Sequence, residues 1–301
     1  MTFANFMDLA LYHPELGYYR RNAARVGYGA GTDFYTASTS GVVFGEMVAA
    51  ACTTLLGGAD PADFTFVEIG SEPDGGVLQG VTHPFGATKT ARVGESIQIT
   101  GRCVVFSNEL FDAQPLRRFV RRGATWSELG VALREDQLHD VELAATTENW
   151  LPADAPEGYV FDAPRAAVDL AALIAAQPWE GLFIAIDYGK SQNELAIETP
   201  AGTVRAYSKH NQSNDLLAQP GEQDLTGHVC WDWLQEVLAA ARFPRPTVES
   251  QEAFFIHHAG AFLAKAMATE ANRLSQRKLS LIQLLHPSHL GQKFQVLHAR
   301  R

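Results

Sequence analysis

Three short, largely apolar runs recur along the chain, and each run ends in polar side chains. The runs lie at residues 64–67, 103–106 and 182–186. A strand that is apolar on both faces is typical of a parallel sheet covered by helices on both sides. The polar residues that follow are Glu68, the pair Asn108 and Glu109, and Asp187. Because the carboxyl ends of parallel strands meet at one edge of a sheet, we expect these side chains to line one ligand crevice.

Segments with apolar residues at helical spacing surround these runs. They are residues 2–11, 42–56, 166–177, 231–241 and 255–271. Further strands are expected at residues 90–99, 247–250 and 294–298. Residues 116–145 alternate apolar and polar side chains, with breaks at Gly123 and Gly130, which is typical of an antiparallel meander. The pattern predicts an α/β fold with an open, doubly wound sheet.

A glycine-rich turn follows the first apolar run. Gly70, Gly75 and Gly76 flank an acidic stretch at residues 71–74, which reads Ser-Glu-Pro-Asp. Glycines at this place let backbone N–H groups approach a nucleotide-like cofactor, whereas the two carboxylates repel an anionic ligand. The local pattern therefore leaves a cofactor loop and an ordinary connection between strand and loop both open.

The polar residues after the second run also have two interpretations. Asn108 and Glu109 are placed for site chemistry if they end a strand. Alternatively, Ser107 or Asn108 caps a helix, and Glu109 and Asp112 are carboxylates stabilised by the dipole of that helix. The local sequence fits both interpretations.

The connection from the first to the third strand is short. Loop, helix, strand and helix together normally take about 45–50 residues, but only 37 residues run from Ser71 to Ser107. Each glycine and proline there disfavours a helix, by about 1 and about 3 kcal/mol respectively. We expect at least one helix to be missing. The acidic residue that usually holds the ribose hydroxyls, at the end of the second strand, has no clear counterpart in this sequence. Glu95 is a weak candidate.

Composition excludes several classes of protein. Of the 301 residues, 46% are apolar and 19% charged, which suits a folded core. A net charge of −10 disfavours nucleic acid and anionic membranes as partners. The first 19 residues contain no Lys or Arg, and no run of 18 apolar residues occurs. We therefore expect no signal peptide and no membrane span, and a cytoplasmic protein.

Cysteines and histidines carry no metal-binding signature. Cys52, Cys103 and Cys230 are too far apart to indicate a CxxC pair or a disulfide framework. The histidines are scattered, with no H-x-x-x-H pair, and the adjacent His257 and His258 point to different faces of a helix. We expect no metal site.

A set of longer motifs gives the chain a family likeness. They are HPELGYY at residues 13–19, TDFYTAS at 32–38, FGE at 44–46, VEIG at 67–70, SNELFDAQP at 107–115, IDYG at 186–189, PGEQDLTGHV at 220–229 and HPSHLGQKFQVL at 286–297. In order and spacing they cover nearly all of the chain outside residues 71–102. On these motifs the chain resembles the MidA-type family of class I S-adenosylmethionine-dependent methyltransferases, whose mitochondrial members methylate an arginine of a respiratory complex I subunit during its assembly.

The resemblance implies a Rossmann-like class I methyltransferase sheet with helices on both faces, an N-terminal helical cap and a small antiparallel β insertion. It implies one domain over residues 1–301, with the cap at 1–60, the core at 61–115 and 160–301, and the β-meander insertion at 116–159. The implied cofactor is S-adenosylmethionine, and the implied partner is a protein substrate; a homo-oligomer is compatible with the sequence.

The resemblance also assigns roles to residues. The implied cofactor-binding residues are Asp33, Phe34, Thr36, Glu68, Gly70, Gly75, Gly76 and Asn108. The implied catalytic residues are Asn108, Glu109 and Asp187. Methyl transfer to a guanidinium nitrogen needs a carboxylate that holds the charged plane and orients a lone pair, and Glu109 and Asp187 are the candidates.

The cofactor loop departs from the family's pattern, and this departure leaves two candidate functions. The family's loop resembles G-P-G-R-G, whereas residues 70–76 read GSEPDGG. The first function is an active methyltransferase with a rebuilt loop. The second is a degenerate relative that has lost the cofactor and serves as a protein-binding or assembly module.

Overall fold

The computed structural model describes residues 1–20, 40–72, 75–271 and 275–301. The predicted cofactor-binding residues Asp33, Phe34 and Thr36 lie outside the described residues. The chain forms two compact units. Unit 1 comprises Met1–Phe34, Phe111–Ala171 and Gly189–Leu234, and unit 2 comprises Tyr35–Leu110, Ala172–Tyr188 and Gln235–Arg301.

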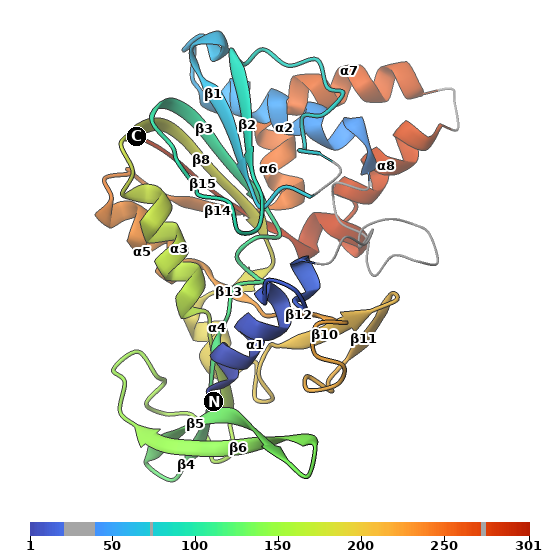
Figure 1. The fold of residues 1–301 in the computed structure, drawn as a ribbon. Helices are drawn as coiled ribbons and strands as arrows, with labels where there is room; N and C mark the ends of the chain where they lie inside the picture. The colour runs from blue at the N-terminus through green and yellow to red at the C-terminus, as the bar shows by residue number, and fades with distance from the viewer. Residues whose placement is uncertain (21–39, 73–74, 272–274) are drawn as a thin grey trace. The chain divides into compact units, whose positions relative to one another are not determined.

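Unit 2 is built on a six-stranded sheet in the order β14-β15-β8-β3-β1-β2 (Figure 1). Its strands are β1 (Thr65–Ile69), β2 (Ala87–Ala91), β3 (Gly101–Asn108), β8 (Trp179–Asp187), β14 (Thr247–Ser250) and β15 (Gln295–Arg300). β1, β2, β3 and β8 run parallel to one another, β15 runs antiparallel to β8, and β14 runs antiparallel to β15. Because β2 and β3 lie on opposite sides of β1, the strand order reverses at β1, which is where open α/β sheets bind ligands.

Helices cover both faces of this sheet, which confirms the predicted fold class. One face packs against α2 (Val42–Leu55), α6 (Gln251–His258), α7 (Gly260–Glu270) and α8 (Gln276–Leu285). Leu182 and Ile184 of β8 belong to that core. Phe183, between them, faces the other way and meets Phe243, which follows α5 (Trp231–Ala240), with ring centroids 6.4 Å apart. Side chains of a strand alternate between faces, so one apolar run supplies both layers.

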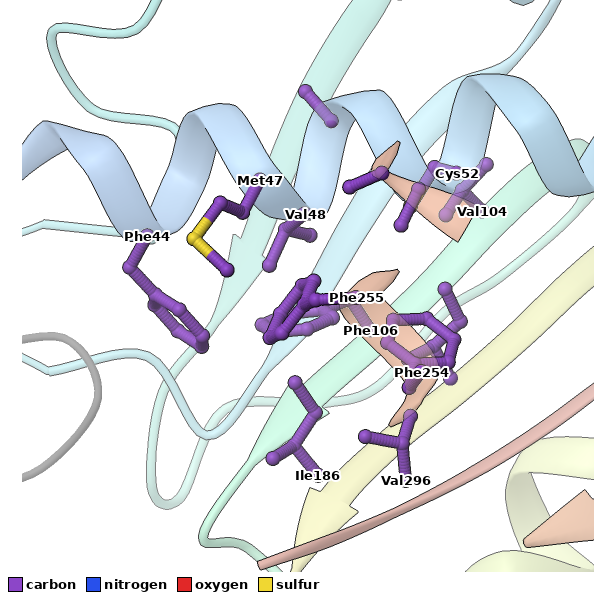
Figure 2. Packing of buried hydrophobic residues seen from close by; sticks show 14 of the residues in the cluster. Phe44, Met47, Val48, Cys52, Val104, Phe106, Ile186, Phe254, Phe255 and Val296 are labelled. Atoms are coloured by element: carbon purple, nitrogen blue, oxygen red, sulfur yellow. The ribbon is translucent and has the colours of Figure 1, made fainter. Parts of the chain in front are cut away.

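Aromatic side chains fill the core between the sheet and α2 and α6. Figure 2 shows Phe44 of α2 and Phe255 of α6 close to Phe106 and Ile186 of the sheet. The rings of Phe44 and Phe255 meet edge to face at 6.1 Å. Burying each such side chain contributes about 1.5–3 kcal/mol. This cluster therefore holds α2 and α6 on the sheet whose strand ends carry the predicted site.

Unit 1 carries the predicted antiparallel meander. Its strands are β4 (Arg117–Arg122), β5 (Thr125–Arg134) and β6 (Gln137–Thr146), joined by β7 (Val160–Ala163) in the order β6-β5-β4-β7. The N-terminal helix α1 (Phe3–Tyr12) begins at Thr2, whose side chain accepts a hydrogen bond from the Asn5 N–H. Phe3 and Met7 of α1 pack in one cluster with Leu116 and Val131.

The remaining elements complete the two units. They are the helical turns η1 (Tyr18–Arg20), η3 (Pro61–Asp63) and η4 (Pro287–Gly291), the helices α3 (Arg165–Ala175) and α4 (Gln192–Ile197), and the strands β9 (Gly189–Lys190), β10 (Arg205–Ser208), β11 (Asn211–Ser213), β12 (Asp224–Thr226) and β13 (Val229–Cys230). None of the helices in the described ranges has both the length and the apolar character needed to cross a bilayer.

The connection between β1 and β3 confirms that helical structure is missing. Among the described residues between 70 and 100 there is no helix, and β2 is the one strand. The strand predicted at residues 90–99 was wrong in extent. β2 ends at Ala91, and a turn follows in which the Arg92 N–H donates to the Glu95 carboxylate at 2.8 Å. Gly94 lies in that turn with a φ of 83°, a conformation that strands do not use.

An irregular segment, residues 76–86, packs where a helix would follow β1. Leu78 and Phe85 are buried in the core, and the Phe85 ring lies 5.2 Å from that of Phe66. The segment also contacts α2. A Cβ built on Gly45 of α2 would lie 2.1 Å from the Val77 carbonyl oxygen. Because Gly45 has no side chain, the backbone of the segment can pack directly against α2 at this position.

We expect Gly45→Ala to lower the free energy of unfolding by about 1–3 kcal/mol, because the added methyl group overpacks against a carbonyl. In an ordinary helix the same change stabilises by about 0.5–1 kcal/mol. Urea titration of both variants and the parent measures the difference. The matched control is Gly260→Ala in α7, where no atom lies within 4 Å of the added Cβ and slight stabilisation is expected. Equal stabilisation by both changes would contradict the packing of Val77 on α2.

Candidate functional site

The structure brings the polar ends of β1, β3 and β8 to one edge of the unit 2 sheet. Strand pairing aligns Ile69 of β1 with Ser107 of β3, and Asn108 of β3 with Ile186 of β8. The residues that come next in each strand therefore emerge side by side. They are Gly70 and Ser71, Glu109, and Asp187. This edge lies at the reversal of strand order, where a ligand is expected.

Glu109 follows β3 in a left-handed backbone conformation. Its φ is 52°, and its backbone N–H donates to the Ile186 carbonyl at 2.9 Å. The Asn108 side-chain amide donates to the Glu109 carboxylate at 3.0 Å. Residues 109–116 form turns, so the alternative of a helix capped by Ser107 or Asn108 was wrong. Such a backbone costs about 1–3 kcal/mol in a non-glycine residue and is typical of functional sites.

Asp187 is the last residue of β8 and is fully buried. Its carboxylate accepts a hydrogen bond from the Tyr188 N–H at 3.0 Å. On the other side β15 pairs with it, at Gln295. A carboxylate held in this way on a central strand has a defined position. Asp187 and Glu109 thus place two acidic groups at the ends of neighbouring parallel strands.

Glu68 is a buried carboxylate that the loop itself binds. It is 8% exposed and accepts a hydrogen bond from the Val77 N–H at 2.7 Å. Burial raises the pKa of Glu68 to about 7, partly offset by the hydrogen bond from Val77 and reinforced by the nearby Glu72 carboxylate. A Cβ on Gly76 would lie 2.4 Å from the same carboxylate oxygen. The absence of a side chain at Gly76 therefore allows the backbone of the loop to lie close to the Glu68 carboxylate.

The other two glycines of the loop also accommodate close contacts. Gly70 has a φ of 82°, and a Cβ there would lie 2.9 Å from the Leu110 side chain. Gly75 has a φ of 131°, and the Gln79 side-chain amide occupies the space where a Cβ would be. At both positions the backbone conformation and a neighbouring side chain, Leu110 or Gln79, disfavour a side chain. Among the described residues between Gly76 and β2 there is no helix, so no helix N-terminus directly follows the loop.

Two buried polar atoms at this edge are available to a ligand. The Ser71 hydroxyl and the Asn108 side-chain oxygen have no hydrogen-bond partner among the described residues. Ser71 follows β1 and Asn108 ends β3, so both lie at neighbouring strand ends. Buried polar atoms normally have partners, and one without a partner indicates a bound water, ion or ligand. A hydroxyl and an amide oxygen fit a polar, nucleoside-containing cofactor. Glu95, by contrast, is exposed and binds its own turn.

A second polar group, in unit 1, was not predicted. The Tyr12 hydroxyl donates to the Ala113 carbonyl at 2.9 Å, and the Tyr19 hydroxyl donates to the Asp224 carboxylate at 3.0 Å. The two rings stack with centroids 5.6 Å apart. Burial raises the pKa of both tyrosines well above the usual range, and Asp224 adds to the shift. Tyr19 and Asp224 lie in the motifs HPELGYY and PGEQDLTGHV, but a motif does not show which distant residue its polar side chains contact.

A cavity of about 520 Å³ in unit 1 contains none of the predicted site residues. Arg118 and Arg205 line it together with His139 and Asp140. Arg118 is paired with Asp162 at 2.8 Å, and Arg205 donates to the Val204 carbonyl at 2.7 Å. Both guanidinium groups are thus already bound within unit 1.

Comparison with known proteins gives methyltransferase relatives. Residues 89–247, just over half of the chain, match the model of a family described as S-adenosyl-L-methionine-dependent methyltransferase. The mitochondrial protein arginine methyltransferase NDUFAF7 of Xenopus laevis is 23% identical, over 98% of this chain and 79% of that protein. The NDUFAF7 of Danio rerio is also 23% identical, over 98% of this chain and 82% of that protein.

Solved structures share the fold. A COG1565 superfamily member from Burkholderia thailandensis, crystallised with S-adenosyl-homocysteine bound, has a TM-score of 0.85 and 22% identity, over 100% of this chain and 88% of that one. A native structure of a COG1565 protein from the same organism has a TM-score of 0.83 and 21% identity, over 100% of this chain and 87% of that one. At this identity the likeness concerns the fold.

We expect Glu68→Gln to stabilise the protein at alkaline pH. The folded state holds a proton on Glu68 up to a pKa of about 7, against an ordinary value of 4.5. Between these values the folded state binds more protons, so stability falls as the pH rises. Glutamine keeps an acceptor for Val77 and cannot ionise.

Urea titrations without ligand at pH 5 and pH 8 test this. The gain in the free energy of unfolding caused by Glu68→Gln should be about 2–3 kcal/mol larger at pH 8 than at pH 5. The control Glu95→Gln, at an exposed carboxylate, should change stability by less than about 0.5 kcal/mol at either pH. A gain that is independent of pH would contradict the buried, protonated state of Glu68.

Proposed function

Since the chain belongs to the S-adenosyl-L-methionine-dependent methyltransferase family, we propose that it transfers a methyl group from this cofactor to a guanidinium nitrogen of an arginine in a protein substrate. The cofactor is that of the family. The reaction on arginine is the activity named for the relatives of Xenopus laevis and Danio rerio. The proposal for this chain rests on the residues at the carboxyl edge of its sheet.

The observation that carries the proposal is the pair of carboxylates on neighbouring strand ends. Glu109 is directed by a left-handed backbone and by the Asn108 amide, and Asp187 is fixed at the end of β8. A guanidinium group is planar and presents several N–H donors, which carboxylates bind in a defined orientation. Two acidic groups beside an apolar sheet core favour a cationic side chain over a neutral or anionic one.

The bound cofactor supplies an electrophilic methyl group on a sulfonium centre. In the proposed site, Ser71 and Asn108 offer the polar atoms without partners to the cofactor. Glu109 binds the guanidinium group and orients the reacting nitrogen. Asp187 provides a second negative charge that stabilises the guanidinium cation. After transfer, the nitrogen releases a proton, which a carboxylate at this edge accepts. Orientation and charge stabilisation are thus the contributions of the protein.

Cofactor binding is the first expectation to test. Calorimetric titration of the full chain with S-adenosylmethionine should give heat of binding. At 100 times the dissociation constant the folded state gains about 2.7 kcal/mol, seen as a rise in Tm. If millimolar cofactor gives no heat and no thermal shift, the enzyme is excluded. The protein-binding module is then left as the function.

We expect Glu109→Gln to retain cofactor affinity within a few-fold and to lower methyl transfer on the order of 100-fold or more. Transfer is measured as labelled methylarginine in hydrolysates after incubation with an extract of the source organism and methyl-labelled cofactor. The control is Glu180→Gln, an exposed carboxylate near the amino end of β8 on the same sheet, which should leave transfer unchanged. Full transfer by Glu109→Gln would remove Glu109 from the reaction.

A further inference from the structure

Three histidines and one glutamate of unit 2 meet beside the outer strands of the sheet. Glu249 lies on the edge strand β14, directly before Ser250, whose side chain caps α6. His257 and His258 are in the last turn of α6, and His298 lies on β15. The register pairs Glu249 with Val296, so Glu249 and His298 are diagonal neighbours. Three separate elements thus deliver their side chains to one place.

The ring nitrogens surround the two oxygens of Glu249 in a defined way. The His258 and His298 Nε2 atoms lie 3.0 and 3.1 Å from the same oxygen, Oε2. The His257 Nδ1 atom lies 2.5 Å from the other oxygen, Oε1. One ligand atom from each of Glu249, His258 and His298 lies within 4.8 Å of the other two. In the described part of the chain, this is the group of three with such a geometry.

These separations are close to those of a metal site. Zinc bonds of about 2.0–2.2 Å in a tetrahedron place neighbouring ligand atoms about 3.3–3.6 Å apart. The distances from Oε2 to the two Nε2 atoms are therefore a few tenths of an ångström shorter than the edges of such a site. Small side-chain movements would admit an ion. Two imidazoles and one carboxylate are a ligand set that suits zinc, whereas magnesium and calcium prefer oxygen ligands alone.

The surroundings support a binding site. Side chains of Glu249, His258 and His298 are 17%, 20% and 11% exposed, so the ligand atoms are shielded but reachable. The Phe254 ring lies 5.1 Å from that of His258 and 5.4 Å from that of His298, which supplies an apolar wall. A ligating carboxylate usually has an outer partner that orients it, and His257 occupies that position on Oε1.

We propose that Glu249, His258 and His298 bind one divalent transition-metal ion, zinc by preference, and that His257 orients the carboxylate. The ion would join β14, α6 and β15. β14 is four residues long and, among the described strands, pairs only with β15, so a metal ligand on it would hold the edge of the sheet. With three protein ligands, the fourth position of the ion is left to water. The proposal does not depend on the methyltransferase reaction.

The test uses the full chain without an affinity tag, freed of metal by a chelator. Titration with zinc chloride should give one binding event per chain and a rise in Tm, and the same concentration of magnesium chloride should give neither. Cobalt(II) should produce the visible absorption of a tetrahedral complex, and zinc should abolish it. Absence of the heat and of the thermal shift with zinc would overturn the proposal.

Variants locate the ion. Glu249→Gln, His258→Gln and His298→Gln should each reduce zinc affinity more than His257→Gln, for which a loss of about 10–100-fold is expected. The matched control is His139→Gln, an exposed histidine of unit 1, with unchanged affinity. Undiminished binding by the Glu249 or His298 variant would place the ion elsewhere and overturn the proposal. If a ligand variant does not fold, the cobalt spectrum of the parent and of His257→Gln decides.

Discussion

Burial of β1, β3 and β8 on both faces is the constraint on which the structure of unit 2 depends. Val104 and Val105 of β3 and Phe183 and Ile184 of β8, which point to opposite faces, are at most 1% exposed, and helices lie over both faces of the strands. A polar side chain in the middle of these strands would lose its hydration without a partner, which is costly. Polar residues are therefore confined to the strand ends. Parallel direction then brings those ends together at one edge, so the position of the candidate site is a consequence of the core.

Loss of helical structure after β1 changes how this edge is built. Residues 76–86 fill the space with a chain that has turns in place of a helix, and Gly45 admits its backbone to α2. The loop glycines accommodate Leu110, Gln79 and the Glu68 carboxylate, which the Val77 N–H binds. These contacts replace the helix N-terminus that usually faces a nucleotide. A cofactor at this edge would depend on side chains of the strand ends, with Ser71 and Asn108 as the available polar atoms.

The histidine cluster follows from the antiparallel end of the same sheet. Since β15 runs against β8 and β14 against β15, β14 leads directly into α6, which returns to the outer strands. Glu249 at the end of β14 is thereby brought to His258 and His298. The histidine spacing predicts no metal site, because no two histidines lie at ligand spacing on one helix. The residues that meet come from three elements.

The sequence by itself indicated the apolar strands of the core and the polar residues at their ends, because burial on both faces requires an apolar run that is visible locally. It also determined that helical structure is missing after β1, since 37 residues cannot hold the usual elements. Only the tertiary structure decided that Asn108 and Glu109 end a strand, that Val77 binds Glu68, and that Glu249 meets His298. Each of these contacts depends on strand register and chain direction, which relate residues that are distant in sequence and leave no trace in local patterns.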